Sequence, residues 1–256
     1  MIANYHTHTF RCHHATENER DYIERAIERK LKILGFSDHV PMPFPDGHES
    51  RFRIWKCDLE DYICSLEALR REYSDRIEIL IGFEAEYYPD LFDDMLSLIG
   101  QYDYDYLIMG QHYIGNEDGS YNPAPTEDAA KLGRYVDQVL EGLSTGKFSY
   151  LAHPDLLNYT PDNEIYHLHM TRLARGCLEL DIPLEINCLG LEQKRNYPCD
   201  RFWRMAAATG NTAVIGCDAH HLYQVADPAT VAEAEEFARH YNITVSDTVK
   251  IRNPKK

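Results

Sequence analysis

Short β-like runs alternate with longer helical segments along almost the whole 256-residue chain. Parallel strands need crossover connections, which are usually helices, so this alternation predicts a parallel α/β sheet. The apolar period of about 3.6 residues places the helices at residues 17–34, 59–73, 91–99, 126–143, 165–180, 201–209 and 229–240. The last of these helices is expected to close the chain. No low-complexity linker interrupts the alternation, so we expect a single domain over residues 1–256.

The seven expected strands each end in a histidine, an acidic residue or an asparagine. They are placed at residues 1–8, 33–36, 77–83, 104–109, 148–152, 183–187 and 212–216, and the polar residues lie at these ends or directly after them. Functional groups of a β/α barrel gather at the carboxyl rim from many strands. An open doubly wound sheet is the structural alternative, but it would concentrate them at one switch point, with a glycine-rich phosphate loop. Neither a G-x-G-x-x-G nor a Walker-type loop is present, so the sequence favours a closed or nearly closed barrel.

Composition and charge exclude several classes of protein. The net charge of −16 argues against a nucleic-acid surface, which needs clustered Lys and Arg. The sequence has no run of about 18 apolar residues, so we expect no membrane span, and no signal peptide is recognisable. The seven cysteines are scattered, odd in number and without a C-x-x-C pair. This pattern argues against a disulfide framework and favours a cytoplasmic protein.

Metal-ligand residues recur at the strand ends and in the first loop. His6 and His8 share one face of the first strand because side chains alternate along a strand. The full set of candidate ligands is His6, His8, His14, His39, Glu84, His112, His153, Asp218 and His220. Nine nitrogen and oxygen donors are too many for one tetrahedral ion and suit two or three cations. Imidazole and carboxylate donors suit zinc, manganese and iron alike.

These residues fall in short motifs whose order resembles that of the PHP (polymerase and histidinol phosphatase) family. The motifs are His6-Thr7-His8, His14-Ala15, Ser37-Asp38-His39, Gly82-Phe83-Glu84, Gly110-Gln111-His112, His153-Pro154-Asp155 and Asp218-Ala219-His220. Within the family, the segments 41–55 and 185–198 resemble the monofunctional histidinol-phosphate phosphatases. The resemblance implies a distorted, TIM-like (β/α)₇ barrel with a trinuclear metal centre. It also implies hydrolysis of L-histidinol phosphate to L-histidinol and phosphate, a step of histidine biosynthesis.

The resemblance also divides the ligands among three divalent ions of zinc, manganese or iron. The implied sets are His6, His8, Glu84 and Asp218 for the first ion, Glu84, His112 and His153 for the second, and His14, His39 and His220 for the third. Glu84 bridges two ions in this division because a carboxylate has two oxygens. His14 is preferred to His13 because the family's loop histidine precedes a small residue.

The hypothesis for the reaction is in-line attack on phosphorus by a hydroxide that bridges the metals, with Glu84, Asp218 and His112 holding the reactive centre. Arg195 is the candidate for a further phosphate contact, because a guanidinium group matches phosphate bidentately. Glu86, two residues beyond Glu84, is the candidate for the ammonium or imidazole group of the substrate. Asp155 or a metal-bound water is expected to protonate the leaving alkoxide.

Other functions compete with this reading. Another small phosphoester or phosphotyrosine is an alternative substrate within the family. A metal-dependent amidohydrolase also opens with His-x-His, but it commonly carries a bridging lysine, and here the strand end offers Glu84. A non-catalytic metal-binding module is the third possibility. The remaining histidines are expected to be surface or loop residues: His13, His48, His167, His169, His221 and His240.

Overall fold

The computed structural model describes residues 1–117 and 120–255 and contains one strongly curled parallel sheet. Its eight strands lie in the order β1-β2-β3-β4-β7-β8-β9-β10. Their bounds are β1 Ala3–Asn4, β2 Ile33–His39, β3 Glu78–Ala85, β4 Tyr106–Met109, β7 Phe148–Leu151, β8 Leu184–Asn187, β9 Thr212–Gly216 and β10 Thr244–Val245. A separate antiparallel hairpin is formed by β5 Tyr113–Ile114 and β6 Ser120–Tyr121. The α/β barrel predicted from the sequence is therefore confirmed, with one short strand added at its end.

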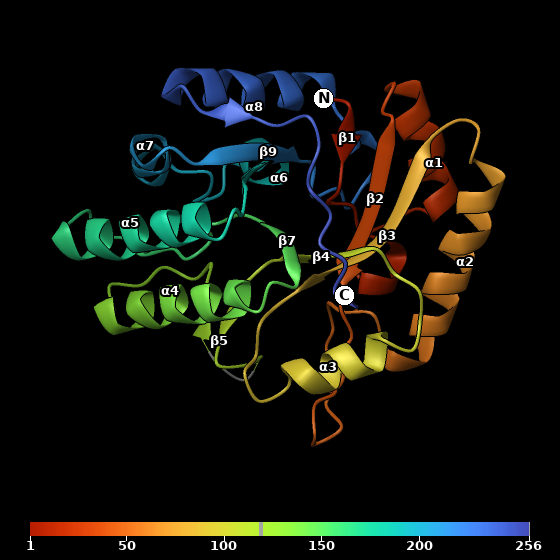
Figure 1. Ribbon diagram of the computed structural model, residues 1–256, viewed down its shortest axis with the longest axis horizontal. Helices are drawn as coiled ribbons and strands as arrows, with labels where there is room; N and C mark the ends of the chain where they lie inside the picture. Colours follow the sequence, from red (N-terminus) through yellow and green to blue (C-terminus); the bar gives the residue numbers. More distant parts are fainter. Residues whose placement is uncertain (118–119, 256) are drawn as a thin grey trace.

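Helices surround the curled sheet, with α1 and α2 on one side and α4, α5 and α7 on the other (Figure 1). Their bounds are α1 Glu19–Glu28, α2 Leu59–Glu72, α3 Phe92–Ile99, α4 Ala129–Ser144, α5 Glu164–Glu179, α6 Cys188–Glu192, α7 Asp200–Thr209 and α8 Pro228–Tyr241, with 3-10 turns η1 Phe10–Cys12, η2 Lys56–Asp58 and η3 Leu222–Gln224. Among the described residues, none of these helices has the length and apolarity that crossing a bilayer requires. The extent of the domain, residues 1–256, stays a prediction.

The first and last parts of the barrel meet at the carboxyl rim. Thr7 forms a parallel bridge with Ala219, and the His8 amide donates to the Ala219 carbonyl at 2.9 Å. The Cys217 amide donates to the Asn4 side chain at 2.9 Å. At the other end of β9, β10 pairs with Thr212 and Ala213 instead. The chain therefore closes on itself at the rim where its histidines lie.

Three boundaries differ clearly from the prediction. The first strand, expected over residues 1–8, spans only Ala3–Asn4, so His6 and His8 follow it and do not lie in it. The first helix ends at Glu28 and not near residue 34, because Lys30 takes a left-handed backbone with φ of 64°. Leu31 lies in the turn after the helix and Leu34 lies in β2. Both are buried in the core, and their spacing happens to continue the apolar period of the helix. The chain also continues past α8 into β10, a two-residue strand too short to leave a periodic signal.

The interior of the barrel is filled by a small cluster with three tyrosines, separate from the larger core under the helices. Tyr5, Tyr106 and Tyr150 pack there with Ile108 and Val214. The Tyr106 hydroxyl lies 2.7 Å from the Tyr5 carbonyl and 3.1 Å from the Phe36 carbonyl, so it ties β4 to the first two strands.

Two glycines make room for the Tyr106 ring. A Cβ at position 35 would lie 2.3 Å from the Tyr106 hydroxyl, and one at position 82 would lie 2.5 Å from its ring. A larger side chain at either position would displace the tyrosine.

The C-terminal segment covers the end of the barrel opposite the histidine-bearing rim. Val249 is buried in the same interior cluster, and its amide donates to the Tyr5 hydroxyl at 3.3 Å. The Arg252 amide donates to the Ser149 hydroxyl at 3.0 Å. One end of the barrel is thus closed by the chain itself, which leaves the carboxyl rim as the open end.

Replacing Tyr106 by phenylalanine is expected to lower the free energy of unfolding by about 1–2 kcal/mol, because the buried Tyr5 carbonyl oxygen loses the hydroxyl that donates to it. Urea denaturation measures the change. The matched control is Tyr104→Phe, since Tyr104 is also a buried residue but its hydroxyl has no hydrogen bond among the described residues. Equal losses in the two variants would contradict the role given to the Tyr106 hydroxyl.

Candidate metal centre

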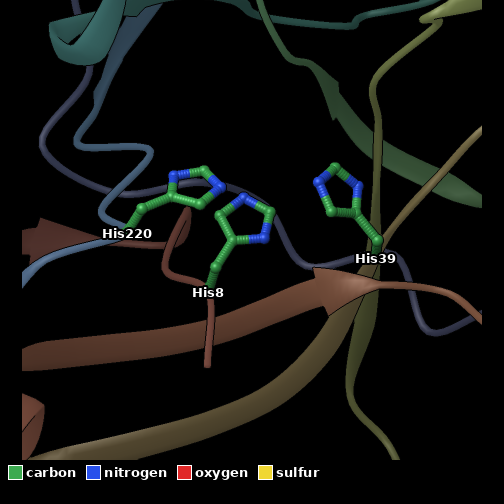
Figure 2. A group of neighbouring side chains, drawn as sticks. All are labelled: His8, His39 and His220. Atoms are coloured by element: carbon green, nitrogen blue, oxygen red, sulfur yellow. The ribbon is translucent and has the colours of Figure 1, made fainter. Parts of the chain in front are cut away.

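All nine candidate ligands converge at the carboxyl rim of the barrel. His6 and His8 follow β1, His14 follows η1, His39 ends β2 and Glu84 lies in β3. The others come from the segments after β4, β7 and β9: His112, His153, Asp218 and His220. The rings of His8 and His220 stack at a centroid distance of 4.1 Å. Figure 2 shows these two rings next to each other, with His39 beside them. Donor atoms of these three residues all lie within 4.8 Å of one another.

Glu84 lies at the centre of the cluster, and each of its oxygens faces different imidazoles. Oε1 is 2.8 Å from His153 Nε2 and 3.7 Å from His112 Nε2. Oε2 lies near three further ring nitrogens: His39 Nδ1 at 3.1 Å, His6 Nε2 at 3.4 Å and His8 Nε2 at 3.6 Å. This arrangement suits a carboxylate that bridges two cations. Only glycine fits at position 110, where a Cβ would lie 1.8 Å from Glu84 Oε1.

Asp218 is the second buried carboxylate of the cluster. Its Oδ1 lies 3.2 Å from His8 Nε2 and 3.5 Å from His6 Nε2, while Oδ2 accepts a hydrogen bond from the Asn187 side chain at 3.1 Å. Asp218 and His153 both have positive φ, at 51° and 31°. Such backbone strain is uncommon outside glycine and tends to occur at functional sites.

The His14 and His220 rings face each other through unprotonated nitrogens. Each Nδ1 lies near a carbonyl oxygen, Cys12 O at 2.7 Å for His14 and Asp218 O at 3.0 Å for His220, so each ring carries its hydrogen on Nδ1. Their Nε2 atoms are 2.9 Å apart. Burial and the neighbouring His8 lower the pKa of both histidines. Two lone pairs therefore point at one another, an arrangement that a cation between or beside them would relieve.

Three buried carboxylates stand behind three of the histidines. Glu185 Oε1 accepts from His6 Nδ1 at 2.8 Å, and Glu86 Oε1 accepts from His112 Nδ1 at 3.0 Å. Asp38 Oδ1 lies 3.4 Å from His8 Nδ1. Each contact keeps the hydrogen on Nδ1 and leaves Nε2 free to bind a cation.

Glu185 was not predicted as part of the site. Its other oxygen accepts from the His153 amide at 3.1 Å and from the Asn187 side chain at 2.9 Å. A Cβ at Gly216 would lie 1.8 Å from Glu185 Oε1, so the fold leaves space for this carboxylate. Its position before Asn187 at the end of a strand, and at the start of the segment 185–198, was the sequence signal available.

The electrostatics of the cluster favour positive charge. Burial alone would lower the pKa of His8, but the nearby carboxylates of Asp218 and Asp38 raise it to about 9. Burial would raise the pKa of the Glu84 carboxyl, but His39 and its neighbours hold it well below its usual value. The carboxylates are therefore ionised and attract cations, and the donor set fits divalent metal ions.

Asp155 lies in a different place from the one expected for a proton donor to the substrate. Its Oδ2 accepts from the Cys199 amide at 2.5 Å, at the start of α7, and its side chain is absent from the lining of the cavity at the rim. Burial raises the pKa of Asp155 to about 6. This carboxylate anchors the loop that precedes α7, a position that argues against the expectation that it protonates the leaving group.

Glu86 also lies outside the cavity lining, in which its expected role would place it. The prediction assigned it to a cationic group of the substrate, but it is 1% exposed and does not line the cavity. Its two oxygens face His112 Nδ1 at 3.0 Å and the Arg53 guanidinium at 2.5 Å. Burial would raise the pKa of Glu86, but Arg53 and His112 hold it below its usual value. It supports a candidate ligand from behind.

A cavity of about 610 Å³ opens above the cluster and is lined in part by aromatic rings. Phe52 and Tyr113 stack at a centroid distance of 6.0 Å, and Tyr121 lies 5.2 Å from Tyr113. Arg195 lines the same cavity, where its Nη1 donates to the Tyr197 hydroxyl at 2.6 Å. The cavity thus combines the ligand cluster, an aromatic surface and one guanidinium group.

The remaining histidines follow the prediction of surface or loop positions, except that His169 is half-buried in α5. His167 pairs with Asp162 at the surface, and His13 packs on Trp55. His221 lies partly exposed in a loop, where it lines the cavity beside His220.

Comparisons with known proteins agree with the geometry. The PHP domain model matches residues 4–188. A probable histidinol-phosphatase of Deinococcus radiodurans is 30% identical over 235 residues, which are 88% of each chain. Another from Schizosaccharomyces pombe is 28% identical over 252 residues, covering 88% of this chain and 82% of that protein. The crystal structure of histidinol phosphate phosphatase from Lactococcus lactis, complexed with zinc, L-histidinol and phosphate, superposes with a TM-score of 0.74 at 19% identity, covering 98% of both chains. On this sequence match, the chain belongs to the PHP-domain family.

Proposed function

We propose that this protein is a metal-dependent phosphomonoesterase that hydrolyses L-histidinol phosphate to L-histidinol and phosphate. The observation that carries the proposal is the convergence of seven histidines on the buried carboxylates Glu84 and Asp218, at the base of a cavity open to solvent. Relatives named as a probable histidinol-phosphatase and a histidinol-phosphatase support the choice of substrate.

Three divalent ions would be held by the sets expected from the sequence. The assignment is His6, His8, Glu84 and Asp218 for the first ion, Glu84, His112 and His153 for the second, and His14, His39 and His220 for the third. When bound, divalent ions polarise phosphoryl oxygens and lower the pKa of a bound water toward about 7. They also supply the positive charge that a chain of net charge −16 lacks for an anionic substrate.

The chain's own residues would orient the substrate in the cavity. Arg195 presents a guanidinium group beside the ligand cluster, where it would contact a phosphoryl oxygen. The stacked rings of Phe52 and Tyr113, extended by Tyr121, offer a flat apolar surface for the imidazole ring of the leaving group. The leaving alkoxide would take its proton from solvent in the cavity, since Asp155 does not reach it.

Metal removal is the direct test of the activity. Dialysis against a chelator is expected to abolish phosphate release from L-histidinol phosphate, and adding back Zn²⁺ or Mn²⁺ should restore it. A panel with glycerol phosphate and phosphotyrosine tests the substrate through kcat/KM. Equal turnover of the whole panel would contradict the assignment to histidinol phosphate, and turnover that survives chelation would contradict the metal centre.

Replacing Arg195 by methionine is expected to lower kcat/KM by roughly 10–150-fold, because a charge-assisted hydrogen bond contributes about 1.5–3 kcal/mol. Steady-state kinetics with L-histidinol phosphate measure the loss. The neighbouring exposed Lys194 provides the control variant Lys194→Met, which should retain wild-type kinetics. If both variants behave like the wild type, Arg195 does not contact the phosphate.

Replacing Glu185 by alanine is expected to weaken metal binding by about 10–100-fold, because His6 loses the acceptor that fixes its ring. Competition between the protein and a chromophoric chelator for Zn²⁺ measures the affinity. Glu179→Ala, at the exposed end of α5, is the matched control and should bind as the wild type does. Unchanged affinity in Glu185→Ala would show that this carboxylate is not needed to hold the ligand.

A further inference from the structure

A fully buried arginine lies between two carboxylates next to the candidate metal centre. Arg53 is 1% exposed and lies in the irregular segment between β2 and η2. Its Nη2 is 2.5 Å from Glu86 Oε2, and its Nε donates to Glu117 Oε2 at 3.3 Å. Removing a guanidinium group from water is costly unless it is paired and hydrogen-bonded. Its position therefore needs both carboxylates.

The inner carboxylate connects Arg53 to a candidate ligand. Glu86 places Oε2 on Arg53 and Oε1 3.0 Å from His112 Nδ1, while His112 Nε2 faces Glu84. A further contact fixes the guanidinium group, since its Nη2 also donates to the Tyr88 hydroxyl at 3.2 Å. The orientation of the His112 ring thus depends on a carboxylate that Arg53 holds in place.

The outer carboxylate connects Arg53 to the aromatic lining of the cavity. Glu117 follows β5, the strand that carries Tyr113, and also accepts from the Ser50 hydroxyl at 2.5 Å. Arg53 itself lies over the Phe52 ring, 4.6 Å from its centroid. One guanidinium group therefore fastens together the two segments that carry Phe52 and Tyr113.

We propose that Arg53 is a positioning residue with two roles: through Glu86 it orients His112 for metal binding, and through Glu117 it holds the aromatic lining that receives the leaving group. The first role rests on the proposed function, in which His112 is a metal ligand. The planar fork of arginine serves two carboxylates at once, which the single ammonium of lysine cannot reproduce. Neither Glu86 nor Arg53 needs to touch the substrate.

Two measurements separate the two roles. Titration of each variant with Zn²⁺ in competition with a chelator tests the metal-binding role, and steady-state kinetics test the role in the aromatic lining. In Arg53→Met, one of the three ions is expected to bind about 10–100-fold more weakly while the other two keep their affinity. Arg53→Lys keeps the charge and should lose roughly three- to tenfold. Glu117→Gln is expected to bind all three ions as the wild type does but to raise KM for L-histidinol phosphate with kcat unchanged.

Two control variants make the result specific. Arg252→Met removes another arginine that hydrogen-bonds main-chain carbonyls, those of Leu180 and Asp181, far from the rim, and should leave Zn²⁺ binding unchanged. His112→Ala should lose the same ion that Arg53→Met weakens. If His112→Ala binds three ions normally, the metal assignment of the proposed function fails. If His112→Ala loses an ion and Arg53→Met loses no affinity, only the positioning role is overturned.

A second measurement applies if Arg53→Met does not fold. Nitrogen-15 NMR of the metal-free wild type should find the His112 hydrogen on Nδ1, and the near-isosteric Glu86→Gln should weaken this preference. A mixture of tautomers in the wild type, unchanged in Glu86→Gln, would overturn the role of the Arg53–Glu86 pair.

Discussion

The structure depends on burying two carboxylates among seven imidazoles at one end of a barrel. Glu84 and Asp218 are both almost fully buried, and ring nitrogens of His6 and His8 lie within 3.6 Å of them without a hydrogen-bond partner. Unsatisfied polar atoms in a low-dielectric interior are costly. Divalent cations satisfy these atoms together, so the cluster is best understood as a binding site that the fold maintains.

The fold brings the ligands together through closure of the barrel at the rim. The bridge between Thr7 and Ala219 sets the histidines after β1 beside Asp218 and His220, which are more than 200 positions away in the chain. Glycines at positions 110 and 216 leave space for the side chains of Glu84 and Glu185. At the opposite end, the Tyr106 hydroxyl and the C-terminal segment close the barrel. Catalytic chemistry is thus confined to one end.

The sequence predicts those parts of the site that recur at the end of each strand of the barrel. A histidine or acid at the end of each strand marks the rim, and the nine candidate ligands found in this way all lie in one cluster. The alternation of strands and helices predicts the barrel, although the two-residue β10 is too short to detect. The apolar period also places the end of the first helix too late in the chain, because buried residues of β2 continue the helical spacing.

The parts that the sequence does not reveal are those set by distant partners. Glu86 and Asp155 were assigned to the substrate because they stand near candidate ligands in the chain. The structure instead pairs Glu86 with Arg53, and Asp155 with the Cys199 amide. Glu185 and Asp38 stand behind His6 and His8, but their spacing in the sequence does not distinguish a supporting carboxylate from a charged residue at the rim.

A crystal structure of the metal-loaded protein, with anomalous scattering recorded at the zinc edge, tests the central claim most directly. Three peaks are expected in the cluster, each about 2.0–2.2 Å from imidazole nitrogens or carboxylate oxygens, with the two oxygens of Glu84 bound to different ions. Peaks that lie elsewhere, or imidazoles that close on one another around Glu84 with no ion between them, would contradict it.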